Sequence, residues 1–304
     1  MTMPNFLIIG AAKAGTTALY HYLQQHPQIY MSPHKEPRFF ALEGQPLDFR
    51  GPGDKTRFKF VTDLDSYRAL FDGVSNQIAI GEASPWYLYV PQAGERIKHY
   101  LPQVKLIAIL REPVARAYSN YTHALREGLE PLEDFALAMD AESARISQNW
   151  SYRWHYQQKG FYYGQLKHYF NLFDREQIRV YLYDDFIRNP VSLLQDIFRF
   201  LEVEDSFIPD LSRKHNVSGI PRNVALDQFL IRDTRPKRVL KRLFPPKTLR
   251  QQLKNKIMEL NLRPKPPLEP EAKKRFQQVY REDILQLQEL IQRDLSKWLE
   301  TTNN

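Results

Sequence analysis

The sequence predicts an α/β fold in which helices flank a doubly wound parallel sheet and a C-terminal amphipathic helix packs on it. Short apolar runs of strand length alternate with segments of helical periodicity along most of the chain. The runs are rich in Ile, Leu and Val, as are strands that helices cover on both faces. The chain has 304 residues, of which 42% are hydrophobic, and this is enough for one large domain of this kind.

Four apolar runs have the length of strands and are bounded by polar residues. They lie at residues 6–9, 78–80, 106–110 and 178–183. Four segments with an apolar stripe at helical spacing lie between and after them, at residues 16–25, 113–125, 166–173 and 190–201. Pro113 stands at the start of the second of these segments, where its fixed backbone angle suits the first turn of a helix.

The C-terminal part of the chain has a different composition. Residues 235–256 carry nine Lys and Arg and no acidic residue, and residues 264–270 are rich in proline, which favours an extended linker. A long segment of helical periodicity follows the linker. We therefore expect a single domain over residues 1–304, with its core at 5–225, the basic segment, and a C-terminal helix at 270–300. The basic segment fits a solvated helix face, which we favour, or a surface for a membrane or an acidic polymer.

The most informative segment joins the first predicted strand to the first predicted helix. It reads Gly10-Ala11-Ala12-Lys13-Ala14-Gly15-Thr16-Thr17. Small residues let the backbone approach an anion closely, and the first N–H groups of the helix point at it. Lys13 adds a positive charge, and Thr16 and Thr17 add hydroxyl donors. Because the lysine precedes Gly15 instead of following it, the segment is not the Walker A pattern of magnesium-nucleotide enzymes, and we expect a phosphate cradle.

Further motifs extend the pattern beyond this loop. Residues 35–40 read Lys-Glu-Pro-Arg-Phe-Phe, residues 81–85 read Gly-Glu-Ala-Ser-Pro, and Ser119 lies eight residues after Arg111. Together with the placement of the lysine in the loop, these motifs resemble the sulfotransferases that use 3′-phosphoadenosine 5′-phosphosulfate. The resemblance is closest to the heparan-sulfate and carbohydrate sulfotransferase type, in a form typical of bacterial members, and it extends over roughly residues 6–225.

The resemblance implies a P-loop-like fold and a role for each matching residue. The donor-binding residues would be Lys13, Ala14, Gly15, Thr16, Thr17, Arg111, Ser119, Ser218, Gly219 and Arg222. The loop would hold the 5′-phosphosulfate, whereas Arg111 and Ser119 would hold the 3′-phosphate, to which an arginine can make a bidentate contact. Glu36 would be the general base and Lys13 would stabilise the bridging oxygen as the 5′-phosphate leaves. We expect burial to raise the pKa of Glu36 toward a range useful for a base.

The implied reaction moves a sulfuryl group from the donor to a hydroxyl or amine of an acceptor, and the resemblance favours a carbohydrate or a small metabolite as that acceptor. The transfer is an in-line displacement that needs positioning and charge neutralisation but no metal, and it leaves 3′-phosphoadenosine 5′-phosphate. Two positions depart from the family pattern, since relatives often have a histidine in place of Arg38 and a lysine in place of Ala83. Both departures lie on the acceptor side in the family, so they count against a heparan-type substrate.

Several other residues have competing interpretations. His34 and His123 are alternative general bases, although an unpaired histidine is more often a structural or surface residue. Glu82 stands at a predicted strand end, where it would either orient Lys13 or pair with an arginine. Tyr162 and Tyr163 would line the acceptor cleft or belong to the core.

Composition limits the class of protein and its surroundings. The chain has no cysteine, which excludes disulfides, thiolate metal sites and a cysteine nucleophile, and suits a reducing compartment. The apolar run at residues 6–9 is too short for a signal peptide, and no apolar run reaches the length of a transmembrane helix. We therefore expect a cytoplasmic protein. The net charge of +8 favours anionic partners such as the phosphorylated donor.

Two other classes of function stay open at this point. A P-loop-type nucleotide kinase or NTPase would explain the loop, but it needs a Walker lysine and an acidic strand end, and neither is evident. A basic nucleic-acid-binding protein would explain the net charge, but the chain has no recognised reader motif. The sequence identifies neither the acceptor, nor O- or N-sulfation, nor the oligomeric state.

Overall fold

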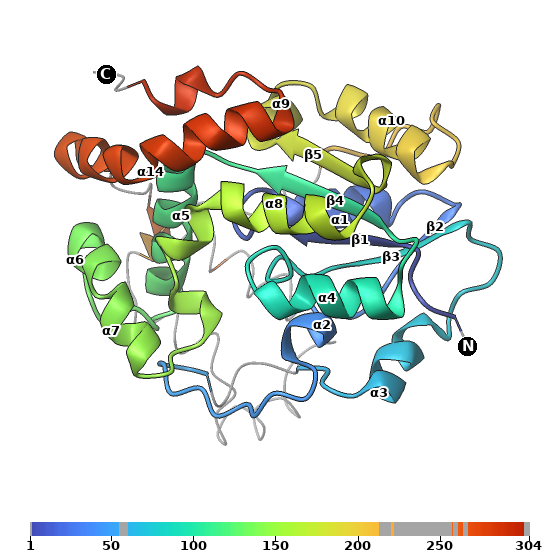
Figure 1. Cartoon of the computed structure of the whole chain (residues 1–304), viewed down its shortest axis with the longest axis horizontal. Helices are drawn as coiled ribbons and strands as arrows, with labels where there is room; N and C mark the ends of the chain where they lie inside the picture. Colours follow the sequence, from blue (N-terminus) through green and yellow to red (C-terminus); the bar gives the residue numbers. More distant parts are fainter. Residues whose placement is uncertain are drawn as a thin grey trace.

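A five-stranded parallel sheet forms the centre of the molecule, and helices cover both of its faces (Figure 1). The computed structural model describes residues 2–54, 60–212, 220–221, 257, 261–263 and 267–300. The strands are β1 (Phe6–Gly10), β2 (Ile29–Met31), β3 (Ala79–Ala83), β4 (Lys105–Leu110) and β5 (Ile178–Leu182), in the order β2-β3-β1-β4-β5. Because β1 lies between β3 and β4, the strand order reverses at β1. Doubly wound sheets bind ligands at such a point, beyond the carboxyl ends of the strands.

The predicted fold class is confirmed. The predicted helix at 190–201 has these bounds in the structure, and the other predicted elements lie within a few residues of their expected positions. Each residue of β1 is buried, as expected for a strand that helices cover on both faces. The helices are α1 (Thr16–Leu23), α2 (Phe39–Leu42), α3 (Leu64–Arg68), α4 (Pro91–Tyr100), α5 (Pro113–Arg126), α6 (Phe135–Asp140), α7 (Glu142–Ser147), α8 (Tyr162–Leu172), α9 (Tyr183–Arg188), α10 (Pro190–Leu201) and α14 (Pro270–Ile291). Short 3₁₀ helices are η1 (Ala69–Phe71), η2 (Tyr152–Trp154), η3 (Gln158–Gly160), η4 (Arg175–Gln177) and η5 (Ser296–Trp298).

Two features of the sheet differ from the expectation. β2 is an edge strand of three residues and is too short to give a pattern. β3 extends to Ala83, although Gly81 and Glu82 have low strand propensity, because these residues pair with Phe6 and Leu7 of β1. A second sheet consists of the short antiparallel strands β6 (Ile220–Pro221) and β7 (Leu262–Arg263).

The C-terminal helix packs on the main domain, as expected, but it ends earlier than residue 300. α14 lies against α8 and α5 (Figure 1). Tyr280 on its inner face is fully buried against Gly160. The helix ends where Gln292 adopts a left-handed conformation, and Trp298 of η5 returns to the core. Asp283 of α14 accepts hydrogen bonds from the backbone N–H groups of Tyr162, at 2.8 Å, and of its neighbour at the start of α8. α8 therefore begins at residue 162, because a partner more than a hundred residues away caps it.

Three predicted donor-binding residues and the basic segment at 235–256 lie outside the described residues. The three residues are Ser218, Gly219 and Arg222. In the parts of the chain that the structure describes, no helix combines the length and the apolar character needed to span a bilayer.

Candidate active site

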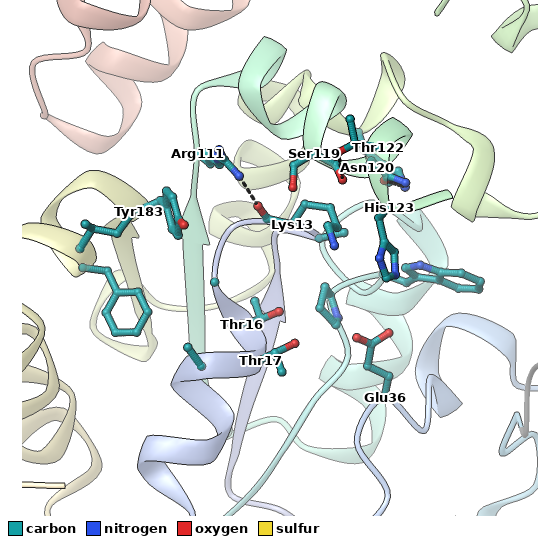
Figure 2. Close-up of a pocket in the computed structure, with 18 of the residues that line it drawn as sticks. Lys13, Thr16, Thr17, Glu36, Arg111, Ser119, Asn120, Thr122, His123 and Tyr183 are labelled. Atoms are coloured by element: carbon teal, nitrogen blue, oxygen red, sulfur yellow. Dashed lines mark hydrogen bonds between the residues drawn. The ribbon is translucent and has the colours of Figure 1, made fainter. Parts of the chain in front are cut away.

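A pocket of about 700 Å³ opens where the loop after β1 meets the start of α5 (Figure 2). This volume suits a ligand of nucleotide size. We call the part lined by Tyr183, Phe186 and Ile187 the Tyr183 end, and the part lined by Glu36, Asn120 and His123 the Glu36 end. Figure 2 shows Tyr183 and His123 on opposite sides of Lys13, with Glu36 below His123.

The loop between β1 and α1 forms the floor of the pocket. Lys13 and Gly15 both have positive φ angles, 70° and 96°. Gly15 cannot be replaced without strain, because a Cβ there would lie 3.1 Å from the ring of Tyr183. α1 begins at Thr16 with no side-chain cap, so the first N–H groups of the helix remain available to an anion. Thr16 and Thr17 line the pocket beside them.

Arg111 leaves the end of β4 and lies directly across from the loop. Its Nη1 donates to the backbone oxygen of Lys13 at 3.3 Å, and its guanidinium lies 4.7 Å from the centre of the Tyr183 ring. Glu112 caps α5 by accepting from two backbone N–H groups, and Pro113 occupies the first turn. The capped helix directs Ser119 into the same pocket (Figure 2). The two predicted phosphate motifs therefore open on one cavity.

Glu36 lies at the other end of the pocket and is held by two cations. Its Oε1 accepts from Lys35 Nζ at 2.8 Å, and its Oε2 accepts from Arg38 Nη2 at 2.5 Å. The Arg38 guanidinium also lies over the ring of Trp86, 4.2 Å from its centre. Burial raises the pKa of Glu36, but Lys35 and Arg38 outweigh it and hold the pKa well below its usual value. The expectation of a raised pKa was therefore wrong, and Glu36 is ionised at neutral pH.

His123 is the predicted alternative base that lies in the pocket. Burial, followed by the charge of Lys13, lowers its pKa to about 3, so the imidazole is neutral at physiological pH. Its Nε2 lies 3.8 Å from Glu127 Oε1, and its Nδ1 lies 3.3 Å from Nη2 of Arg126. His34, the other candidate base, does not line the pocket.

The structure brings most of the described site residues together. Those that line the pocket are Lys13, Gly15, Thr16, Thr17, Glu36, Arg111 and Ser119. Ala14 does not line it, because its side chain is buried and its N–H donates to the oxygen of Ala11 at 3.2 Å. Tyr162 belongs to the core, and its hydroxyl donates to the backbone oxygen of Arg111 at 3.0 Å. Tyr163 lies beside it on α8, outside the pocket lining.

Among the described residues, Glu82 contacts neither Lys13 nor an arginine, the two partners predicted for it. It is fully buried, and the hydroxyl of Tyr67 donates to its Oε1 at 3.3 Å. Burial raises the pKa of Glu82 to about 7. The side chain therefore belongs to the interior behind the pocket.

Comparison with known proteins identifies the family to which this pocket belongs. The model of the sulfotransferase family matches residues 4–207, which is most of the chain. The chain belongs to the sulfotransferase family. A crystal structure of a sulfotransferase from Alicyclobacillus acidocaldarius is 34% identical, with a TM-score of 0.78 over 99% of this chain and 100% of that one.

Curated relatives are longer than this chain and match it over a smaller part of its length. The membrane-associated sulfotransferase kil1 of Dictyostelium discoideum is 23% identical over 76% of this chain and 63% of its own length. The human bifunctional heparan sulfate N-deacetylase/N-sulfotransferase 3 is 35% identical over 40% of this chain and 13% of its own length. The chain thus spans less than two thirds of the length of either relative. The predicted resemblance to the heparan-sulfate type is confirmed at the level of sequence.

This sulfotransferase pocket also contains residues that the sequence analysis missed. Among them are Tyr22, Trp86, Thr122, Arg126, Arg153, Phe186, Ile187 and Leu211. Helical spacing gives a signal for one of them, since Arg126 follows Ser119 and His123 on one face of α5. The start of α9 gives another, because it follows β5, the neighbour of β4 in the sheet. Arg153 and Lys159 come from the short 3₁₀ helices η2 and η3, whose few residues give no helical periodicity.

Proposed function

We propose that this chain transfers a sulfuryl group from 3′-phosphoadenosine 5′-phosphosulfate to a hydroxyl or amine of an acceptor. The observation that carries the proposal is the shared cavity of the loop after β1 and the β4–α5 junction, with the Glu36 carboxylate at its far end. We also propose that residues 1–304 act as a single catalytic domain. When bound, the donor supplies an activated sulfuryl group joined to a 5′-phosphate.

The residues of the pocket fit this donor in charge, and the volume of the pocket suits its size. The donor carries roughly four negative charges, from ordinary phosphate and sulfate ionisation. Lys13 and the start of α1 would bind the 5′-phosphosulfate, and Arg111 with Ser119 would bind the 3′-phosphate. In the described part of the chain Arg111 makes no ion pair with a carboxylate, so its charge is available to a phosphate. The apolar Tyr183 end offers aromatic surface for a purine ring.

Lys13 and Glu36 would carry the two charge changes of the transfer. Lys13 would stabilise the negative charge that develops on the bridging oxygen as the 5′-phosphate leaves. Glu36, already ionised, would accept the proton from the acceptor hydroxyl or amine. Its two ion pairs keep it free of a proton, and they also weaken it as a base. We therefore expect Lys35, the more exposed of the two partners, to release Glu36 when the acceptor binds.

The acceptor class proposed here is a carbohydrate or a small metabolite. A relative that acts on heparan sulfate supports a carbohydrate. The ring of Trp86, which lines the Glu36 end, supports it as well, because sugar rings pack on aromatic faces.

Thermal unfolding with nucleotides tests the donor site. The protein is melted with 3′-phosphoadenosine 5′-phosphate and, in parallel, with ATP plus magnesium, ADP and adenosine 5′-monophosphate. A ligand at about a hundred times its dissociation constant adds about 2.7 kcal/mol, which raises the melting temperature by a few degrees. We expect this rise with the 3′-phosphorylated nucleotide, and its loss in Lys13→Met but not in Lys167→Met, an exposed lysine of α8. An equal response to ATP plus magnesium would favour a kinase or NTPase, and no response to any nucleotide would overturn the proposal.

His123 is the second candidate for the general base, because it lines the pocket in its neutral form. Release of 3′-phosphoadenosine 5′-phosphate from the donor is followed with a panel of sugar and small-alcohol acceptors. Glu36→Gln should abolish acceptor-dependent release and leave nucleotide binding intact, whereas His123→Asn should keep most of the release. The opposite result would assign the base to His123.

A further inference from the structure

Lys159 is a buried lysine whose amino group contacts no carboxylate among the described residues. It lies in η3, lines the pocket and is 4% exposed. Its Nζ donates to Asn120 Oδ1 at 2.9 Å and to the backbone oxygen of Arg153 at 3.4 Å. Both acceptors are neutral, and among the described residues Lys159 forms no ion pair. A buried ammonium in this setting lacks the compensation that buried charges normally have.

The charged groups around Lys159 are mostly positive. Arg116, Arg153 and Lys13 oppose the charge of Lys159, and Glu142 is the acidic group that favours it. Glu142 is itself engaged, since it accepts from the backbone N–H groups of two residues that precede Lys159. Burial, followed by Arg116, lowers the pKa of Lys159 well below its usual value.

The hydrogen bond to Asn120 places Lys159 at the Glu36 end of the pocket. Asn120, to which it donates, lies at the Glu36 end, on the opposite side of Lys13 from Tyr183 (Figure 2). Arg126 lines the same end and lies within hydrogen-bond distance of His123. The Glu36 end therefore has hydrogen-bond donors and positive charge in addition to the residues proposed to bind the two phosphates of the nucleotide.

We propose that Lys159 binds a tetrahedral oxyanion at the Glu36 end of the pocket and takes up a proton as that oxyanion binds. The inference rests on the proposed function, since the oxyanion is either the sulfuryl group of the donor or a sulfate or phosphate group of the acceptor. An anion in contact with Nζ favours the ammonium form and makes a charge-assisted hydrogen bond. The proton comes from solvent, and no bond other than N–H forms.

Calorimetric titration tests the proposal with three ligands. They are the donor, 3′-phosphoadenosine 5′-phosphate, and inorganic sulfate added to the complex with 3′-phosphoadenosine 5′-phosphate. Each titration is repeated at about pH 8.5 in buffers of different ionisation enthalpy, because histidines and phosphates no longer titrate there. We expect the wild type to take up a sizeable fraction of about one proton with the donor or with sulfate. Lys159→Met should lose that uptake and bind the same ligand roughly 10- to 100-fold more weakly. The exposed-lysine variant Lys167→Met should match the wild type.

The outcomes separate the two sources of the oxyanion. A loss of donor affinity with unchanged binding of 3′-phosphoadenosine 5′-phosphate assigns the sulfuryl group to Lys159. If Lys159→Met binds sulfate more weakly but binds the donor with unchanged affinity, the group that Lys159 binds is an anionic group of the acceptor.

Other outcomes overturn the inference without overturning the proposed function. If the wild type binds the nucleotides but takes up no proton with any ligand, Lys159 does not respond to an oxyanion, and this result needs no variant. Equal affinities and equal uptake in the wild type and Lys159→Met would lead to the same conclusion. If the wild type binds none of the three ligands, both the inference and the proposed function fail.

Discussion

Removal of both cations beside Glu36 should move its pKa from below its ordinary value to above it. In the double variant Lys35→Met/Arg38→Met, neither the 2.8 Å nor the 2.5 Å ion pair can form. Burial, which raises the pKa of Glu36, then acts without an opposing charge. A carboxylate that is ionised at neutral pH in the wild type would become one that titrates near physiological pH.

The geometry sets the size of this change. Unit charges about 4 Å apart attract by about 4 kcal/mol at an effective dielectric constant of about 20, which corresponds to about 3 pKa units. The Glu36 side chain is 27% exposed, so solvent screens part of this attraction. We expect each pair to contribute on the order of 1–2 units, and the double variant to titrate with a midpoint between about pH 5 and 7.

Carbon-13 NMR of the glutamate carboxyl groups measures the midpoint without an acceptor. The Glu36 signal is assigned as the one missing from Glu36→Gln. The control is Arg96→Met, which removes the 3.8 Å ion pair of Arg96 with Glu43 and leaves both cations beside Glu36 in place. The wild type and the control should show no Glu36 midpoint above about pH 4. A double variant that also shows none between about pH 4 and 8 would refute the account of Glu36 as a partly buried carboxylate held ionised by two cations.

Three further predictions concern the loop, the 3′-phosphate site and the C-terminal helix. Gly15→Ala places a Cβ on a residue with a φ of 96°, 3.1 Å from the Tyr183 ring. It should therefore lower the free energy of unfolding by roughly 1–2 kcal/mol and weaken nucleotide binding, and an unchanged melting temperature would contradict this. Arg111→Lys keeps the positive charge but loses the two parallel hydrogen bonds that a guanidinium can make to a phosphate. The affinity for 3′-phosphoadenosine 5′-phosphate should fall about 10- to 100-fold, whereas the affinity for adenosine 5′-monophosphate should stay the same. Equal losses for both nucleotides would show that Arg111 does not bind the 3′-phosphate. Burial raises the pKa of Asp283 to about 6, so its stabilising contribution is complete below the unfolded pKa of about 4 and is lost as the pH rises through 6. The free energy of unfolding of Asp283→Asn, relative to that of the wild type, should therefore rise by on the order of 1–3 kcal/mol between about pH 4 and 7, as measured by denaturant unfolding. A difference between the two proteins that does not depend on pH would contradict the raised pKa of Asp283.

The sheet was predictable from local sequence because its central strands are uniformly apolar. β1 and β4 are buried along nearly their whole length, and short, uniformly apolar runs are typical of such strands. The ends of other elements were less predictable, because distant partners determine them. β3 continues through Gly81 and Glu82 because β1 pairs with it, and α8 starts early because Asp283 caps it.

The residues proposed to bind the donor were likewise more predictable from the sequence than those at the Glu36 end of the pocket. Its residues come from two continuous motifs, each of which joins the end of a central strand to the start of a helix. The Glu36 end is assembled from separate segments, and Lys159 reaches it from a 3₁₀ turn that α14 covers. The sequence analysis identified Glu36 but gave the wrong direction for its pKa, because that direction depends on where Lys35 and Arg38 point.

Unusual backbone conformations occur where local sequence did not predict the structure. Six residues other than glycine have positive φ angles in the described part of the chain, and three of them, Lys13, Glu36 and Arg38, line the pocket. Such conformations are unfavourable by roughly 1 kcal/mol or more each, and they persist only where surrounding contacts impose them. The contacts are visible for the second segment, since Glu36 N–H donates to Ala83 of β3 at 3.1 Å and Arg38 N–H donates to Ser84 Oγ at 3.0 Å. The end of β3 thus holds the Glu36 segment in a shape that its own sequence disfavours. This explains why the segment's structure was not predictable locally, and it ties the position of the proposed base to the sheet that also carries the donor loop.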